Sequence, residues 1–271
     1  MFPGVLSPYS VLWRLIILDG RCNMSYGFRA TDEDLFKYIF EGDQAELAKH
    51  LRRHPSAAKN AKVTLTHQEK DLVYSPLHFA ISWTESTEIV DTLLDNGVDI
   101  DEEFQSGSAL CFAATNGKTE IVRHLLRRGA RLGLAGPDGY NDLHGAARNG
   151  HREICKVLLE HGDDINSRHP ITEDSPLSYA AGGGHHAILR DLLEEGANID
   201  NRAWTGFTPL AVACQNNHLA NVVSLLQAGA DAGLGDNHGA PPIHKAAQRD
   251  HHSVLKVLLE HGCDKDQVRK N

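Results

Sequence analysis

The stretch Ser75-Pro76-Leu77-His78 begins a pattern that returns at regular spacing along the 271-residue chain. Its counterparts are Ser108-Ala109-Leu110-Cys111, Asn141-Asp142-Leu143-His144, Ser175-Pro176-Leu177-Ser178, Thr208-Pro209-Leu210-Ala211 and Pro241-Pro242-Ile243-His244. The steps between successive starts are 33, 33, 34, 33 and 33 residues. A second pattern, Leu-Leu-x-x-Gly, follows in phase and ends at Gly97, Gly129, Gly162, Gly196, Gly229 and Gly262. A period of this length indicates a repeat protein.

Each unit carries signals for two short helices. A Ser, Thr or Asn precedes the first helix and caps it, and a Pro often stands at the first helical position. Apolar residues in the pattern of Ile121, Val122, Leu125 and Leu126 predict the second helix. The Gly that follows ends this helix in a left-handed conformation. Because one helix pair cannot bury its apolar face alone, the units are expected to stack into a solenoid.

These features resemble ankyrin repeats, with a Gly-His turn at Gly150-His151 and Gly184-His185 and a Gly-Ala-Asp ending at Gly229-Ala230-Asp231. The resemblance covers residues 71–266 with six copies of the repeat. Together with a degenerate copy before them, it implies an all-α ankyrin-repeat solenoid of helix-turn-helix units with β-hairpins, about seven repeats in all. The first unit is a degenerate capping repeat at residues 31–58. The others are expected at residues 71–103, 104–136, 137–169, 170–203, 204–236 and 237–271.

Two segments lie outside the repeat pattern. Residues 1–30 form an N-terminal segment of uncertain structure, expected to supply a short helix or strand that packs on the first repeat; a wrongly assigned start codon is the alternative. Its apolar residues 11–18 are too few for a membrane span, which needs about 20, and no Lys or Arg precedes Arg14 to mark a signal peptide. Residues 55–74 are expected to form an extended hairpin or loop.

Composition and motifs argue against several functions. The formal net charge of -9 disfavours binding to nucleic acid. The five cysteines form no C-x-x-C and predict buried free thiols, and the repeat explains the histidines of the helix starts and turns. No catalytic motif stands out, so we expect no enzyme, no catalytic residue, no metal and no cofactor. A basic cluster at Arg123, Arg127, Arg128 and Arg131 is either a solvated face or a site for an acidic partner.

In ankyrin-repeat proteins, the hairpin tips and first helices line a concave face whose residues vary from unit to unit, and the resemblance therefore places a protein-binding site there. Aromatic and Arg side chains dominate protein interfaces. The residues expected to bind a partner are Phe104, Tyr140, Arg148, Trp204, Phe207, Gln215, His238 and Arg249. Packing on the hairpin itself is the alternative for Tyr140 and Phe207.

The resemblance thus implies a protein-protein interaction module that acts as a scaffold, adaptor or regulatory subunit. We expect a monomer in the cytoplasm or the nucleus, with another protein as partner and no membrane span. One alternative is a substrate-recognition subunit for ubiquitination, although such subunits normally carry a ligase-docking box and no room for one is seen after residue 266. Others are an accessory protein of an enzyme or membrane complex, anchored by residues 1–30, or a truncated piece of a larger enzyme or receptor.

Overall fold

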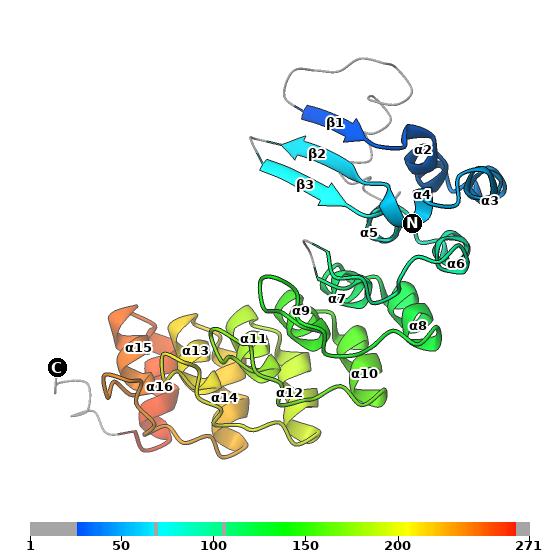
Figure 1. Ribbon diagram of the computed structural model, residues 1–271. Coiled ribbons are helices and arrows are strands. Elements are labelled where there is room, and N and C mark those ends of the chain that lie inside the picture. The colour runs from blue at the N-terminus through cyan, green and yellow to red at the C-terminus, as the bar shows by residue number, and fades with distance from the viewer. Residues whose placement is uncertain (1–25, 68–69, 105–106, 264–271) are drawn as a thin grey trace, which may run out of the picture. The chain divides into compact units, whose positions relative to one another are not determined.

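A computed structural model describes residues 26–67, 70–104 and 107–263 (Figure 1). The chain divides into two compact units. The first comprises the chain up to residue 113 together with residues 120–130, and the second comprises residues 114–119 and 131 onward. The expected segment at residues 11–18 and Cys22 lie outside the described residues.

The first unit combines helix pairs with a small sheet (Figure 1). Its strands are β1 (Tyr26–Ala30), β2 (Val63–His67) and β3 (Lys70–Tyr74). Its helices are α2 (Glu33–Glu41), α3 (Gln44–Arg53), α4 (Ala57–Asn60), α5 (Pro76–Trp83), α6 (Thr87–Asp95) and most of α7 (Ala109–Thr115) and α8 (Thr119–Arg127).

The sheet is antiparallel with strand order β1-β2-β3. Val63 pairs with Tyr74 in the hairpin β2–β3, and Ala30 pairs with Val63 on the other side of β2. The hairpin agrees with the expectation for residues 55–74. The third strand was missed, because β1 pairs with residues far along the chain and its five residues give no pattern of their own.

Caps and core packing hold the first unit together. The side chains of Asp32 and Asp43 accept hydrogen bonds from backbone N–H groups at the starts of α2 and α3, each over 3.0 Å. The rings of Phe36 and Phe79 meet edge to face, with centroids 5.2 Å apart and both side chains fully buried. Such pairs add about 1 kcal/mol beyond the burial of their area. The helix α2 packs against α5 and α3 packs against α6, as successive repeats would.

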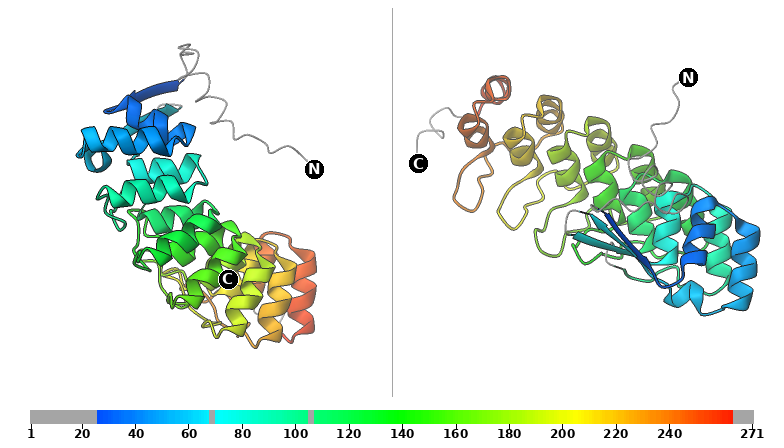
Figure 2. Two further views of the ribbon diagram at one scale, coloured as in Figure 1. Left: turned by 90° about the vertical axis from the view of Figure 1, so that its right-hand side faces the viewer. Right: turned by 90° about the horizontal axis from the view of Figure 1, so that it is seen from above.

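The second unit is a stack of helix pairs. Its helices are α9 (Asp142–Asn149), α10 (Arg152–Glu160), α11 (Pro176–Gly183), α12 (His186–Glu194), α13 (Pro209–Gln215), α14 (Leu219–Gln227), α15 (Pro242–Gln248) and α16 (His252–Glu260). The first helices α9, α11, α13 and α15 contact one another in chain order, and so do the second helices α10, α12, α14 and α16 (Figures 1 and 2). The mostly helical repeat fold is thereby confirmed.

The expected caps begin the first helices. Side chains of Asn141, Ser175 and Thr208 accept hydrogen bonds from backbone N–H groups one turn on, and Pro176 and Pro209 occupy first helical positions. Removing such a cap typically costs about 1 kcal/mol. The hairpins expected between repeats are reduced to turns of a few residues, closed for example by the bond from Ala203 N to Phe207 O over 2.9 Å.

Turn histidines join successive repeats. The Nε2 atoms of His151, His185, His218 and His251 lie 2.9 to 3.0 Å from backbone carbonyl oxygens of the preceding repeat. A side chain at Gly150, whose φ is +82°, would bring its Cβ within 2.7 Å of the His185 ring. The Gly-His turn is therefore a packing motif between repeats, as the sequence predicts.

Three departures from the repeat are accommodated locally. Asn217 and Asp250 replace the turn glycine with φ of 61° and 56°, a conformation that Asn and Asp tolerate better than most residues. Asn221 replaces an apolar residue and is buried, with its Nδ2 donating to the carbonyls of Ala180 and Ala181. The amide nitrogen of Asn221 is thus satisfied by carbonyl groups of α11.

One member of the basic cluster, Arg128, is bound to its neighbours in the first unit. Arg128 pairs with Asp91, and it pairs with Asp95 over 2.7 Å, while His124 Nε2 lies 2.8 Å from Asp91. Arg128 is therefore not free for an acidic partner. Among the described cysteines, Cys111, Cys155 and Cys214 are buried and Cys263 is half-buried, and all four are free thiols as expected.

Candidate protein-binding surface

A groove of about 430 Å³ runs across the first helices of the second unit. We call it the first-helix groove. Residues from α9, α11, α13 and the turns before α11 and α13 line it, and they mix aromatic, polar and charged side chains. They are Arg148, Asp174, Ser178, Tyr179, Gly182, Gly183, Thr205, Phe207, Val212 and Gln215.

A cluster of aromatic rings borders the groove at α9. The ring of Tyr140 lies 5.2 Å from Tyr179 and 5.0 Å from His169, measured between centroids. The Arg148 guanidinium lies 4.9 Å from the Tyr140 ring, and its Nη1 donates to the Tyr140 hydroxyl over 2.5 Å. Arg148 is exposed. These contacts hold a cation in a fixed place beside the groove without burying it.

Two glycines in the groove lining allow neighbouring side chains to pack closely. A Cβ at Gly182 would lie 2.9 Å from Cγ1 of Val212, and a Cβ at Gly183 would lie 2.6 Å from the ring of His185. Larger residues therefore do not fit without displacing their neighbours. The two glycines let the side chains of Val212 and His185 pack directly against the backbone of α11.

The remaining walls are partly desolvated. Burial raises the pKa of the Tyr179 phenol, and it also raises the pKa of the Asp174 carboxyl. Lys245 Nζ lies 4.7 Å from the centre of the Phe207 ring and is paired with Asp236. Polar groups that water reaches poorly gain more from a hydrogen bond to a ligand than exposed groups do.

The turns beside the groove carry two exposed apolar side chains. Ile171 and Trp204 are each 70% exposed. Their backbones are held in place, since Trp204 N donates to Thr172 O over 2.8 Å and Asn237 Nδ2 donates to Trp204 O over 2.7 Å. Exposed apolar side chains whose backbone is held by hydrogen bonds are candidates for contact with another protein.

The turn of Ile171 contains the extra residue of the 34-residue step. Glu173 adopts a φ of 57°, which is uncommon for a residue other than glycine. Its N–H donates to His169 O over 2.8 Å, and Arg168 pairs with its carboxylate over 2.6 Å. The insertion is therefore folded into a tight turn that presents Ile171 and Thr172.

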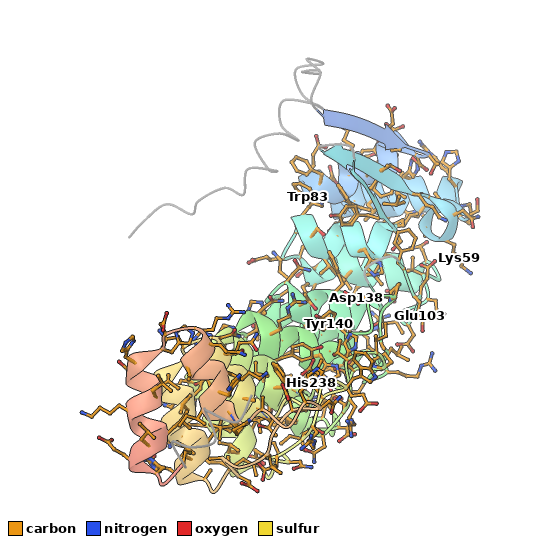
Figure 3. All side chains as sticks on the ribbon, turned by 90° about the vertical axis from the view of Figure 1, so that its left-hand side faces the viewer. Lys59, Trp83, Glu103, Asp138, Tyr140 and His238 are labelled. Carbon is orange, nitrogen blue, oxygen red and sulfur yellow. The ribbon has the colours of Figure 1, made fainter. Side chains whose placement is uncertain are left out.

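The structure brings together part of the predicted set. Arg148, Phe207 and Gln215 line the groove, with Tyr140 against Arg148. The other second-unit residues do not line the groove. Trp204 and His238 lie in turns and Arg249 at the end of α15, and all three are exposed. Figure 3 labels Tyr140 and His238 among all the side chains. Phe104, in the first unit, is half-buried with its ring 5.6 Å from His78.

Sequence reasoning missed Tyr179 as a groove residue. It occupies the fourth position of its first helix, where the other repeats have Phe79, Phe112, Gly145, Val212 or Lys245. This variability between units was a usable signal. Ile171 is absent from the predicted binding set, because its exposure depends on how the extra residue folds.

The described residues contain no group of three or more His, Cys, Asp or Glu that could hold a metal ion. Burial raises the pKa of the Cys155 thiol to about 12, which leaves it unreactive at neutral pH. None of the helices that the structure describes combines the length and apolar character needed to cross a bilayer.

Comparison with known proteins identifies the class. The family description "Ankyrin repeats (3 copies)" matches residues 77–169, 143–236 and 177–269. Ankyrin repeats are protein-interaction modules, and the fold is typically non-catalytic. Because these matches cover more than half of the chain, the protein belongs to the ankyrin-repeat family.

Individual relatives match parts of the chain. Over 108 residues, it is 39% identical to "Ankyrin repeat and SOCS box protein 11" of Danio rerio, covering 38% of this chain and 35% of that protein. Over 150 residues, it is 33% identical to "E3 ubiquitin-protein ligase XBAT33" of Arabidopsis thaliana, covering 53% of this chain and 27% of that protein. The chain spans about a third or less of the length of the curated relatives it matches.

Among solved structures, the crystal structure of the human ASB11 ankyrin repeat domain is similar, with a TM-score of 0.64 and 28% identity. The match covers 70% of this chain and 85% of that chain. The likeness therefore extends through most of an ankyrin domain.

Proposed function

We propose that this chain binds an extended segment of another protein in the first-helix groove and acts as a scaffold, adaptor or regulatory subunit. The observation that carries the proposal is the groove itself, which Arg148, Tyr179 and Phe207 line. Ile171 and Trp204 extend this surface with apolar side chains.

The lining favours a segment with one carboxylate and one apolar side chain. Arg148 forms no ion pair with a carboxylate among the described residues, so its charge is available to a ligand. Tyr179, Phe207 and Val212 offer apolar surface beside it.

Affinity purification with mass spectrometry would identify partners, whose binding is then measured for variants. Phe207→Ala and Arg148→Ala are expected to weaken binding about 30-fold, because truncating an interface anchor costs about 2 kcal/mol. Lys256→Ala is the matched control, since Lys256 is an exposed cation on α16. Unchanged binding by both groove variants, at equal folding, would place the partner elsewhere.

A second candidate is substrate recognition for ubiquitination. It is favoured by the likeness to a protein named for a SOCS box and to an E3 ubiquitin-protein ligase. In that case the groove would hold the substrate to be modified. Purified complexes containing ligase subunits, and substrate ubiquitination that Phe207→Ala reduces, are the expected results.

The remaining parts of the proposal concern the state of the protein. We propose a monomer of the cytoplasm or nucleus that performs no catalysis itself and needs neither metal nor cofactor. Sedimentation, fluorescence imaging of the tagged chain and metal analysis of the purified protein test these points. A stoichiometric metal, or unfolding by a chelator, would contradict them.

A further inference from the structure

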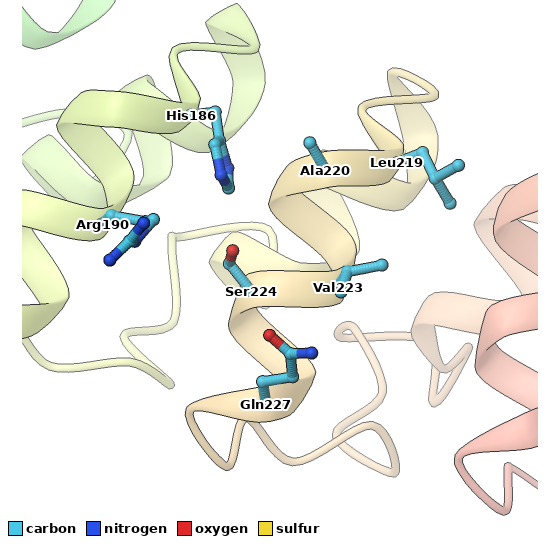
Figure 4. Close-up of a pocket in the computed structure, with 7 residues that line it drawn as sticks. All are labelled: His186, Arg190, Leu219, Ala220, Val223, Ser224 and Gln227. Atoms are coloured by element: carbon cyan, nitrogen blue, oxygen red, sulfur yellow. The ribbon is translucent and has the colours of Figure 1, made fainter.

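A second groove, of about 580 Å³, lies on the second helices of the same unit. We call it the second-helix groove. Figure 4 shows His186 and Arg190 of α12 facing Ala220, Ser224 and Gln227 of α14, with Leu219 and Val223 beyond them. The first-helix groove shares none of these residues.

The helix α14 differs from the other second helices. Each of α6, α8, α10, α12 and α16 contains charged residues, whereas α14, with the sequence LANVVSLLQ, contains no ionisable residue. The loss of charge lies at its outward positions, and its one departure in the core is Asn221. Its buried residues Val222 and Leu225 match the core positions of the other repeats.

An exposed ion pair that occurs in both neighbouring second helices is absent from α14. In α12, Arg190 pairs with Glu194 over 3.0 Å, and in α16, Lys256 lies 3.8 Å from Glu260. The same two helix positions in α14 hold Val223 and Gln227. A solvated pair is thus replaced by an apolar side chain and a neutral one.

The exposed apolar side chains of α14 are not needed for the core. Leu219 is 38% exposed, Ala220 is exposed and Val223 is half-buried. The equivalents of Leu219 are polar in the neighbouring repeats, namely Arg152, His186 and His252. An apolar patch among charged helices is a feature that contact with another molecule explains.

The wall of the groove formed by α12 favours an acidic group on the ligand. Arg190 carries a positive charge, and its partner Glu194 is mostly exposed, with 65% of its side chain accessible. Such an exposed pair contributes little stability, so an incoming carboxylate can take the place of Glu194. The groove therefore favours a ligand with an acidic edge beside an apolar face.

We propose that the second-helix groove binds an amphipathic helix of a partner protein. Apolar residues of that helix cover Leu219, Ala220 and Val223, and an acidic residue pairs with Arg190. Two neighbouring helices form ridges and grooves into which a third helix packs, and helix-in-groove recognition uses anchors one turn apart. This surface acts independently of the first-helix groove.

A selection from a phage-displayed library of helical peptides on the full chain tests the proposal. Selected peptides are then synthesised, and their affinity is measured by fluorescence anisotropy. Enriched sequences are expected to repeat apolar residues one helical turn apart and to carry Asp or Glu beside them. Leu219→Glu and Val223→Glu are each expected to lower their affinity by about tenfold or more, because a charge replaces buried apolar contact.

Matched controls locate the binding. His252→Glu introduces the same charge at the same position of α16 and should leave the affinity unchanged, and so should Phe207→Ala. Arg190→Glu should weaken acidic peptides, while peptides with Lys in place of the acidic residue should regain affinity for it. This charge exchange tests the contact even where Leu219→Glu does not fold, as judged by circular dichroism.

Three outcomes would overturn the proposal: failure to enrich any peptide sensitive to Leu219→Glu or to charge reversal at Arg190, enrichment of basic peptides, or equal loss with His252→Glu. Peptides that respond only to Phe207→Ala would support the first-helix groove and count against this one. The two surfaces can therefore fail separately.

Discussion

The first helices and the second helices of the second unit use one framework in different ways. Ala146, Ala180 and Ala213 in the first helices are fully buried, so the backbones of neighbouring repeats come close. The second helices are amphipathic, with a buried apolar side and a charged exposed side. Close packing of the first helices leaves a groove bordered by a few large side chains. Among the second helices, α14 is exceptional because it carries no charged residue.

The largest expected effect is a loss of stability, which tests whether the first and the second helices share one core. Leu158 in α10 and Leu177 in α11 are both fully buried. Leu158→Ala and Leu177→Ala should each destabilise the protein by about 2 to 5 kcal/mol, because each leaves a cavity. Denaturant unfolding followed by circular dichroism measures this. A negligible loss of unfolding free energy at either site would contradict a core shared by both sets of helices.

A smaller effect concerns a buried histidine at the start of a first helix. Burial lowers the pKa of His144 to about 4 from 6.5. Between these values the unfolded state binds more protons than the folded state, so stability is lost as the pH falls below about 6.5. Acidification from about pH 7.5 to about pH 5 should cost the wild type about 2 kcal/mol more than His144→Gln. An identical pH dependence of both proteins would exclude this role.

Asp163, after the second helix α10, should show the opposite sign. Burial raises its pKa to about 6 from 3.8. The folded state therefore binds more protons between these values, and the stability from this group is lost as the pH rises through 6. The same acidification should stabilise the wild type by about 1 kcal/mol relative to Asp163→Asn. The variant should also be the more stable protein at neutral pH, and the reverse order would contradict the prediction.

The smallest effect on stability is expected at the exposed turns. Ile171 and Trp204 are 70% exposed. Ile171→Ser and Trp204→Ala should change the free energy of unfolding by less than about 0.5 kcal/mol, since surface substitutions rarely do more. Trp204→Ala should nevertheless weaken partner binding. A large drop in the thermal midpoint would instead give Trp204 a structural role.

Much of the fold follows from short-range signals in the sequence. The steps of 33 and 34 residues, the caps Ser175 and Thr208, and the Gly-His turns each act within one repeat or between two adjacent repeats. Such local signals are repeated along the chain, and each repeat supports the interpretation of the next. The position of Arg148, Phe207 and Gln215 on one surface was predictable for the same reason.

Tertiary structure alone decided what these positions form together. Tyr179 borders a groove only because Tyr140 and Arg148 of the preceding repeat pack beside it. The exposure of Ile171 depends on how Glu173 absorbs one extra residue, and β1 depends on pairing with β2 more than 30 residues later. The sequence by itself determined the repeat, because a repeat is specified by local spacing. The binding surfaces required the folded chain, because their side chains come from different repeats and meet only once the helices are stacked.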